Sequence, residues 1–300
     1  MKKFFTFAAY ALLAVALPLT FTACGSDDDD EPETPSTPDP EDTWDPTTET
    51  PPHATALSGL RKGTDGKYYL LTHYEGIGKY GTYPYDITYN GQWVEYYGDY
   101  EWSASRLRSL TDDYQYNLND KGQLTTIYHT WKDSDSEGYA SYIISYGANG
   151  IAGYKYTQTS KSSDETRTYE YTYTYTWRDG DISKITRKGT WSSKYTDGRT
   201  YSGTYDDVRT YNYLTVENTD GRLYDEFLPG NFEALNWGMK GTKHQLKSRS
   251  YVDNTNSDNN QTRSYGLTHN AAGLLTQYKY HDSTNYEYTT NYSYTEYKKK

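Results

Sequence analysis

The chain has 300 residues, a formal net charge of −11 at pH 7 and 38 tyrosines. The acidity is concentrated: residues 24–56 hold eleven acids and no Lys or Arg, whereas residues 57–300 hold 30 acids against 28 bases. A nucleic-acid-binding domain is expected to carry a basic face or stripe, and neither the balance nor the spacing of Lys and Arg shows one, so nucleic acid is excluded as the expected partner.

The first 23 residues have the pattern of an export signal. Lys2 and Lys3 precede an apolar run from Phe4 to about Phe21, which is short for a membrane span and typical of a secretory signal peptide. We therefore expect residues 1–23 to be removed from the mature protein.

The only cysteine, Cys24, follows Phe21-Thr22-Ala23. This arrangement resembles a bacterial lipobox, in which signal peptidase cuts before the cysteine and its sulfur receives the lipid. The alternative is a structural cysteine in an uncleaved helix. Lipidation at Cys24 would anchor the protein stably to a membrane.

Residues 24–56 are acidic and rich in proline, which predicts a disordered, extended tether. The run Gly25–Glu31 resembles the acidic export signal of Bacteroidota surface lipoproteins, and a solvated acidic spacer is the alternative. We expect the protein to be lipid-anchored at the outer membrane and exposed at the cell surface.

Residues 57–300 are predicted to form one domain built on tyrosine. Leu, Ile, Val and Phe are only about one residue in eight here, whereas Tyr and Trp recur at the period of a β-strand. From Tyr169 to Trp177 every odd position is aromatic and every even position is polar. One face of such a strand is an aromatic wall that can build a core.

A repeat follows the strands along the chain. Each copy has a strand, a short turn of the type Asp/Asn-x-Gly, an apolar residue and a second strand, and glycine supplies the positive φ that tight turns need. The turn glycines Gly122, Gly150 and Gly180 are 28 and 30 residues apart. Longer polar links separate the copies at 132–137, 159–167 and 252–263.

This alternation predicts an all-β fold, an antiparallel up-and-down meander that forms a closed or half-open barrel. Residues 224–246 have a different texture, with Phe227, Leu228 and Trp237 near Pro229, and predict a short helix or a loop that plugs one end.

The acidic leader and the Tyr-rich strand pairs joined by Asp/Asn-x-Gly-x-Leu turns resemble a Bacteroidota lipoprotein family of unknown function with a porin-like fold. The resemblance covers most of 60–297 and is strongest in Tyr169–Ile185, around Asn236–Leu246 and in Tyr265–Tyr297. It implies a fold, but no catalytic or binding residues.

A membrane-spanning barrel needs an apolar band facing lipid, and here Thr, Ser, Asp, Glu and Lys lie opposite the aromatic residues. The chain ends in Lys298-Lys299-Lys300, whereas outer-membrane barrels usually end in an aromatic insertion signal. We expect a soluble barrel tethered outside the membrane.

No metal, cofactor or catalytic group is expected. Asp133–Gly138 matches the first half of a calcium loop, but Ile144 stands where a bidentate Glu should close the shell, which favours a polar loop. The six histidines have no metal-ligand spacing, and the domain has no thiol.

Exposed aromatic residues are the remaining candidates for a ligand site, and the alternative is that they form the core of a Leu-poor fold. The favoured hypothesis is a non-catalytic surface lipoprotein that binds a glycan or an amphipathic lipid. A glycoside hydrolase with paired carboxylates and a purely structural or adhesive module are the alternatives, and nothing in the sequence indicates an oligomeric state. The candidate binding residues are Trp93, Trp102, Trp131, Trp191 and Trp237.

Overall fold

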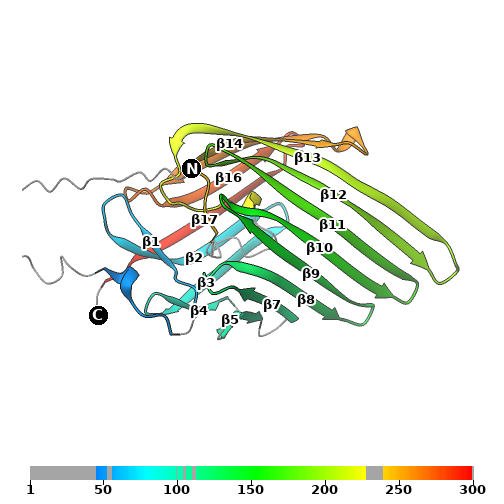
Figure 1. The fold of residues 1–300 in the computed structure, drawn as a ribbon, viewed down its shortest axis with the longest axis horizontal. Helices are drawn as coiled ribbons and strands as arrows, with labels where there is room; N and C mark the ends of the chain where they lie inside the picture. Colours follow the sequence, from blue (N-terminus) through cyan, green and yellow to red (C-terminus); the bar gives the residue numbers. More distant parts are fainter. Residues whose placement is uncertain are drawn as a thin grey trace, which may run out of the picture. The chain divides into compact units, whose positions relative to one another are not determined.

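A computed structural model shows one antiparallel sheet that curls into a barrel (Figure 1). It contains seventeen strands among the residues that it describes, which are 45–52, 56–98, 100–103, 106–109, 113–227 and 239–298.

Each strand from β2 to β17 pairs with the next one along the chain, and β17 then pairs with β2. Tyr292 of β17 lies opposite Tyr74 of β2, so the paired strands form a closed ring. The predicted all-β, up-and-down barrel is confirmed. Its strands are β1 (Leu60–Lys62), β2 (Tyr68–Gly78), β3 (Gly81–Asn90), β4 (Trp93–Tyr97), β5 (Tyr100–Ser103), β6 (Arg106–Ser109), β7 (Asp113–Leu118), β8 (Leu124–Lys132), β9 (Ser136–Gly147), β10 (Gly150–Ser162), β11 (Glu165–Arg178), β12 (Asp181–Tyr195), β13 (Thr200–Glu217), β14 (His244–Asp253), β15 (Gln261–His269), β16 (Leu275–Asp282) and β17 (Glu287–Glu296); the short 3-10 helices are η2 (Pro46–Thr48), η3 (Asp225–Phe227) and η5 (Ser257–Asn259).

The alternate strand positions that carry aromatic residues point into the interior of the barrel. On β11, Tyr173 and Tyr175 are buried, whereas Thr172, Thr174 and Thr176 are exposed. The period-2 pattern is confirmed at the centre of this strand, because alternate side chains of a strand point to opposite faces of the sheet.

The glycine turns at Gly122, Gly150, Gly180, Gly221 and Gly273 join strands at the same end of the barrel, which we call the turn end. In three of them the glycine N–H donates to the carbonyl of the asparagine three residues earlier: Gly122 to Asn119, Gly221 to Asn218, and Gly273 to Asn270. The three glycines have φ between 62° and 74°, which explains the residue type. The opposite end of the barrel, which we call the open end, carries the other set of connections.

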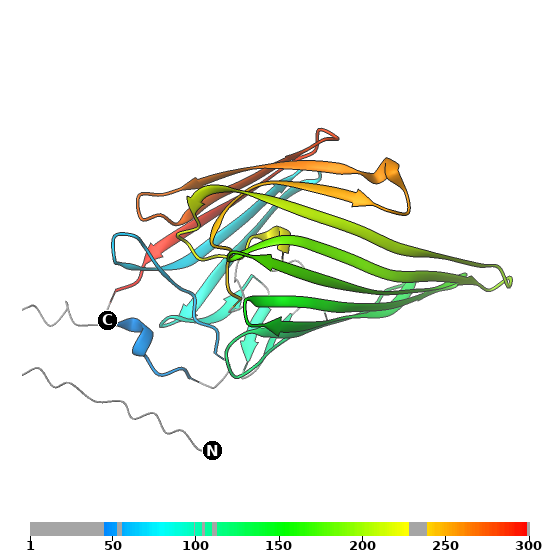
Figure 2. The ribbon, with the colours of Figure 1, turned by 45° about the horizontal axis from the view of Figure 1, so that its top comes forward.

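At that opposite end, the strands have very unequal lengths. β11, β12 and β13 have 14, 15 and 18 residues, whereas β5 and β6 have four each. The expected polar link at 159–167 is mostly strand, because its residues pair as far as Lys161 with Thr166. The long strands project beyond the rest of the barrel, in green and yellow-green in Figures 1 and 2.

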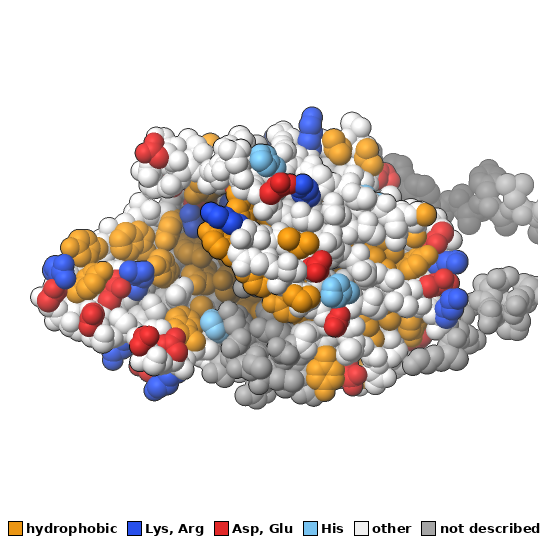
Figure 3. All heavy atoms as spheres, turned by 180° about the vertical axis from the view of Figure 1, so that it is seen from behind, with side chains coloured by type: hydrophobic (Ala, Val, Ile, Leu, Met, Phe, Trp, Pro, Cys, Tyr) orange, Lys and Arg blue, Asp and Glu red, His pale blue; other side chains and the backbone are white. Residues whose placement is uncertain are grey.

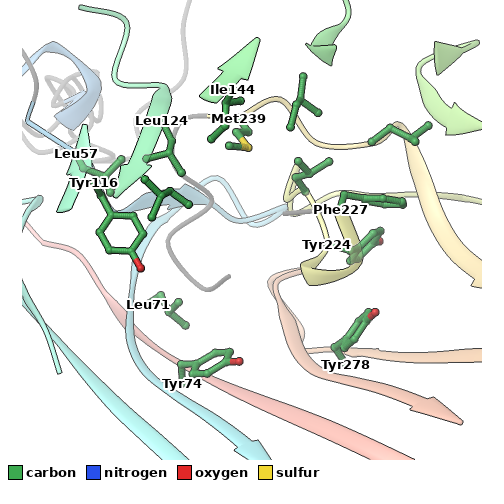
Figure 4. Close-up of a cluster of buried hydrophobic side chains, with 14 of the residues drawn as sticks. Leu57, Leu71, Tyr74, Tyr116, Leu124, Ile144, Tyr224, Phe227, Met239 and Tyr278 are labelled. Carbon is green, nitrogen blue, oxygen red and sulfur yellow. The ribbon is translucent and has the colours of Figure 1, made fainter. Parts of the chain in front are cut away.

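The connection between β13 and β14 fills part of the interior. Tyr224 and Phe227 are almost completely buried, Tyr224 stacks on Tyr278 of β16, and the hydroxyl of Tyr175 donates to the carbonyl of Phe227 at 2.7 Å. Figure 4 shows Tyr224 and Phe227 directed among side chains from the strands. The predicted short irregular or helical segment near 224–246 is confirmed at η3; residues 228–238 lie outside the described residues, and residues 244–246 belong to β14.

Residues 45–52, which the sequence assigns to the tether, contact the turn end of the barrel. The Tyr68 hydroxyl donates to Asp45, and the Tyr297 hydroxyl donates to Glu49. The buried side-chain amide of Gln92 donates to the carbonyl of Pro46. Residues 45–52 are therefore held against Tyr68 of β2 and Tyr297, which follows β17. The pairing of these two strands closes the barrel.

The outer face of the long strands is polar. Lys155 and Glu170 form an ion pair of 2.6 Å there, and Lys188 lies 3.8 Å from Asp206. A lipid-facing barrel wall would be apolar at these positions. Among the described residues, no helix has the length and hydropathy needed to cross a membrane.

Candidate binding site at the open end of the barrel

The inner face of the projecting strands carries half-buried and exposed aromatic rings. Cross-strand register places Tyr169 opposite Trp191, and the Tyr171 and Tyr205 rings meet edge to face at 5.5 Å. We call these four residues together with Tyr201, whose side chain is exposed, the aromatic shelf. Figure 3 shows a hollowed face bordered by side chains of the hydrophobic class, which in that view include tyrosine.

Two glycines make room for the tryptophans of this end. A Cβ at Gly203 would lie 2.5 Å from Nε1 of Trp191, and a Cβ at Gly138 would lie 2.3 Å from the ring of Trp131. The Trp191 ring therefore lies close to the backbone of Gly203 on the neighbouring strand. Trp191 is half-buried, so part of its indole ring remains accessible as an aromatic surface for a ligand.

Next to the shelf, three arginines surround one glutamate. Nη1 of Arg249 donates to Oε1 of Glu226 at 2.5 Å, and Nη1 of Arg263 donates to Oε2 at 3.1 Å. Nη1 of Arg209 lies 4.0 Å from Oε1. We call these four residues the arginine cluster. The arginines come from the neighbouring strands β13, β14 and β15, and Glu226 comes from η3 inside the barrel.

The arginines keep Glu226 ionised. Burial of the carboxyl raises its pKa, but the charges of Arg249, Arg209 and Arg263 outweigh burial, and the pKa of Glu226 lies below its ordinary value. A carboxylate held in this state is a poor general acid at neutral pH, because it carries no proton to donate.

Tyrosine rings support the guanidinium groups. The Arg263 guanidinium lies 4.2 Å from the ring centre of Tyr280, and the Arg187 guanidinium lies 4.3 Å from that of Tyr205. Burial raises the pKa of Tyr280 to about 12, so its ring is neutral at physiological pH and does not cancel the charge above it. Cation–π contacts of this kind fix the orientation of an arginine.

An open pocket of about 290 Å³ lies over the arginine cluster. It is lined by Arg209, Arg249, Tyr251, Asn259, Gln261 and Arg263.

The candidate tryptophans of the sequence do not form one site. Trp131 and Trp191 lie toward the open end, on strands that precede the turns at 133–135 and 196–199. Trp93 begins β4 at the turn end, where it pairs with Ser58. The side chain of Trp102 and all of Trp237 lie outside the described residues, as does Cys24.

The other sequence candidates serve local structure. The Asp133 carboxylate accepts hydrogen bonds from the N–H groups of Asp135 and Ser136, as expected for a polar turn. Among the described residues, no group of three His, Cys, Asp or Glu side chains is arranged to hold a metal ion.

Sequence reasoning missed the arginine cluster, although a signal was present. Arg209 shares its strand phase with Tyr211 and Tyr213, and Arg263 shares its phase with Tyr265 and Leu267. A charged residue in the inward phase of an otherwise aromatic strand indicates a buried polar site.

No protein-family model and no curated protein matches the sequence. Two solved structures are similar in part. A porin-like protein from Bacteroides vulgatus ATCC 8482 has a TM-score of 0.49 and 10% identity, covering 75% of this chain and 98% of its own. A porin-like protein from Bacteroides uniformis ATCC 8492 has a TM-score of 0.28 and 13% identity, with the same coverage.

Proposed function

We propose that this protein is a non-catalytic surface lipoprotein that binds a glycan on the aromatic shelf at the open end of its barrel. The observation that carries the proposal is the shelf itself: aromatic rings on the inner face of strands that project past their neighbours. Loops and open ends on a rigid scaffold are where binding residues gather, and aromatic rings give contact area with little loss of rotamer freedom.

A glycan fits this surface better than the acyl chain of an amphipathic lipid. The described interior is packed with Tyr175, Tyr224 and Phe227, so its centre is occupied. The shelf carries phenol hydroxyls and lies beside arginines, which suit the hydroxyl groups of a sugar and not a hydrocarbon.

The chemistry of the interior acids favours binding over hydrolysis. Glu226 is tied to arginines and held ionised. Asp207, another buried acid, accepts from Nε of Arg187 at 2.5 Å. A glycoside hydrolase needs one carboxyl group with a raised pKa to protonate the leaving oxygen, and Glu226 has the opposite shift.

Anchoring through Cys24 belongs to the same proposal. A lipidated cysteine would hold the protein at the outer membrane, on a tether that the sequence predicts to be extended.

The test is a titration of the purified protein with a panel of polysaccharides, followed by tryptophan fluorescence. We expect a saturable change with at least one glycan, and chromatography of the same samples to return that glycan intact. Trp191→Ala should abolish the change. Trp93→Ala, at the turn end, is the matched control and should retain it.

Cleaved products in those samples would show that the protein hydrolyses the glycan, and would overturn the non-catalytic function. Flat titrations across the whole panel would leave a structural or adhesive module as the function. Equal losses in Trp191→Ala and Trp93→Ala, with both variants folded by circular dichroism, would move the site away from the shelf.

A further inference from the structure

We propose that the arginine cluster is a subsite for an acidic group, a carboxylate or a sulfate, carried by the glycan that the shelf binds. This inference rests on the proposed function and narrows it to acidic glycans.

The pocket is lined by hydrogen-bond donors. Its six lining residues comprise three arginines, two amides and one tyrosine, and none of them is an acid. Glu226 lies behind the arginines, with a side chain only 4% exposed, so its charge does not line the opening. Guanidinium groups match the geometry of oxyanions, with which they form paired, charge-assisted hydrogen bonds.

The arginines of the cluster outnumber the acid that they contact. Three guanidinium groups share the single carboxylate of Glu226. Nearby Asp207 is paired with Arg187. The carboxylates of Asp253 and Asp282 lie at strand ends and accept hydrogen bonds from the turns that follow them, and Asp282 also lies opposite Arg263 in the strand register.

The cluster also has hydrogen-bonding capacity that the described residues do not use. The Nε atoms of Arg209, Arg249 and Arg263 are buried and have no hydrogen-bond partner among those residues. The Arg249 side chain is only 6% exposed. Buried donors without acceptors cost free energy, and a negative charge in the pocket would stabilise the three guanidinium groups that carry them.

Arg187 connects the pocket to the shelf. Its guanidinium lies over the ring of Tyr205 on the shelf, and its Nη2 donates to the hydroxyl of Tyr251, which lines the pocket, at 3.5 Å. A sugar stacked on the shelf therefore has the pocket beside it. An acidic substituent on that sugar, or on its neighbour along the chain, would reach the arginines.

The experiment compares three oligosaccharides by isothermal titration calorimetry with the full protein. Oligogalacturonate carries carboxylates, its methyl ester has the same rings without charge, and a carrageenan oligosaccharide carries sulfate alone. We expect the free acid to bind at least about tenfold more tightly than the ester, with affinity falling as NaCl rises from about 0.05 M to about 0.5 M. Binding of the carrageenan oligosaccharide then shows whether a sulfate group also occupies the pocket.

Variants on β15 test the location of the subsite without disturbing the buried ion pairs. Gln261→Glu adds a negative charge to the pocket lining, and should weaken binding of the acid by at least about tenfold while leaving the ester unchanged. Thr262→Glu adds the same charge one residue further, on the exposed outer face of the strand, and is the control. It should bind like the unmodified protein.

Equal affinities for the acid and its ester, or equal effects of Gln261→Glu and Thr262→Glu, would overturn the acidic subsite and leave glycan binding intact. A titration with inorganic sulfate tests whether the anion site exists without glycan binding. If sulfate binds, and is lost in Gln261→Glu, while no oligosaccharide binds, the anion site stands as an oxyanion site and glycan binding fails.

Discussion

Arg249 donates a 2.5 Å hydrogen bond to Glu226, and both side chains are almost completely buried inside the barrel. Glu226 also accepts from Arg263, so one acid joins β14 and β15 to the segment that fills the interior. An ion pair removed from water is sensitive to the loss of either partner, because the remaining charge is then left unpaired.

We therefore expect Glu226→Gln to lower the free energy of unfolding by about 3–5 kcal/mol, the usual cost of breaking a buried ion pair from one side. Urea denaturation followed by circular dichroism measures it. Glu287→Gln is the control, because Glu287 pairs with Lys279 on the exposed surface, and its midpoint should hardly move. Similar midpoints for the two variants would mean that the cluster does not support the fold.

Acid should remove the contribution of Glu226. Its folded-state pKa lies below the ordinary 4.5, so the stabilisation is complete above pH 4.5 and is lost as the pH falls through the lower folded-state value. The stability difference between the unmodified protein and Glu226→Gln should be large at pH 7 and smaller at about pH 3. A difference that stays constant over this range, measured by urea denaturation at each pH, would contradict the assignment.

Tyr173→Ala should cost about 3–4 kcal/mol, because it removes a ring that stacks on Tyr154 at 4.5 Å and a hydroxyl that accepts from Arg209. Thr174→Ala changes the next residue on the exposed face of the same strand and should cost far less. The two unfolding midpoints, compared at equal m-values, test which face of β11 forms the core.

Gly203→Val should displace Trp191 from the sheet, because a Cβ at this position would lie 2.5 Å from the indole nitrogen. The expected result is a shifted tryptophan emission and a loss of glycan affinity of about tenfold or more, with the fold preserved. Gly266→Val is the matched strand variant, since a Cβ there would meet nothing within 4 Å. Unchanged emission in Gly203→Val would show that Trp191 does not depend on this gap.

Cys24→Ser should abolish lipidation and leave a folded protein. Metabolic labelling of the producing bacterium with a fatty-acid analogue measures this directly. Label retained in the serine variant would exclude Cys24 as the attachment site.

The strands and turns could be predicted because their determinants are local. Alternation from Tyr169 to Trp177 gives the inward face of β11, and the spacing from Asn119 to Gly122 gives a turn in which the glycine bonds back to the asparagine. These patterns are complete within one or two strands, so no distant part of the chain is needed to interpret them.

The arginine cluster could not be predicted in the same way, because its members lie far apart in sequence. Arg209, Glu226, Arg249 and Arg263 come together only through the register of β13 with β14 and of β14 with β15. A single residue of register slip would move each arginine to the outer face. The projecting strands were also missed, because Thr159–Arg167 is polar enough to be interpreted as a loop while its backbone pairs with neighbouring strands.

The two ends of the barrel carry different features. Asp45 and Glu49 are held at the turn end, beside Tyr68 and Tyr297, while the projecting strands end on the other side (Figure 1). Residue 45, the first that the structure describes, therefore lies at the end of the barrel away from the shelf. A ligand bound at the shelf would therefore leave the hydrogen bonds that hold residues 45–52 undisturbed.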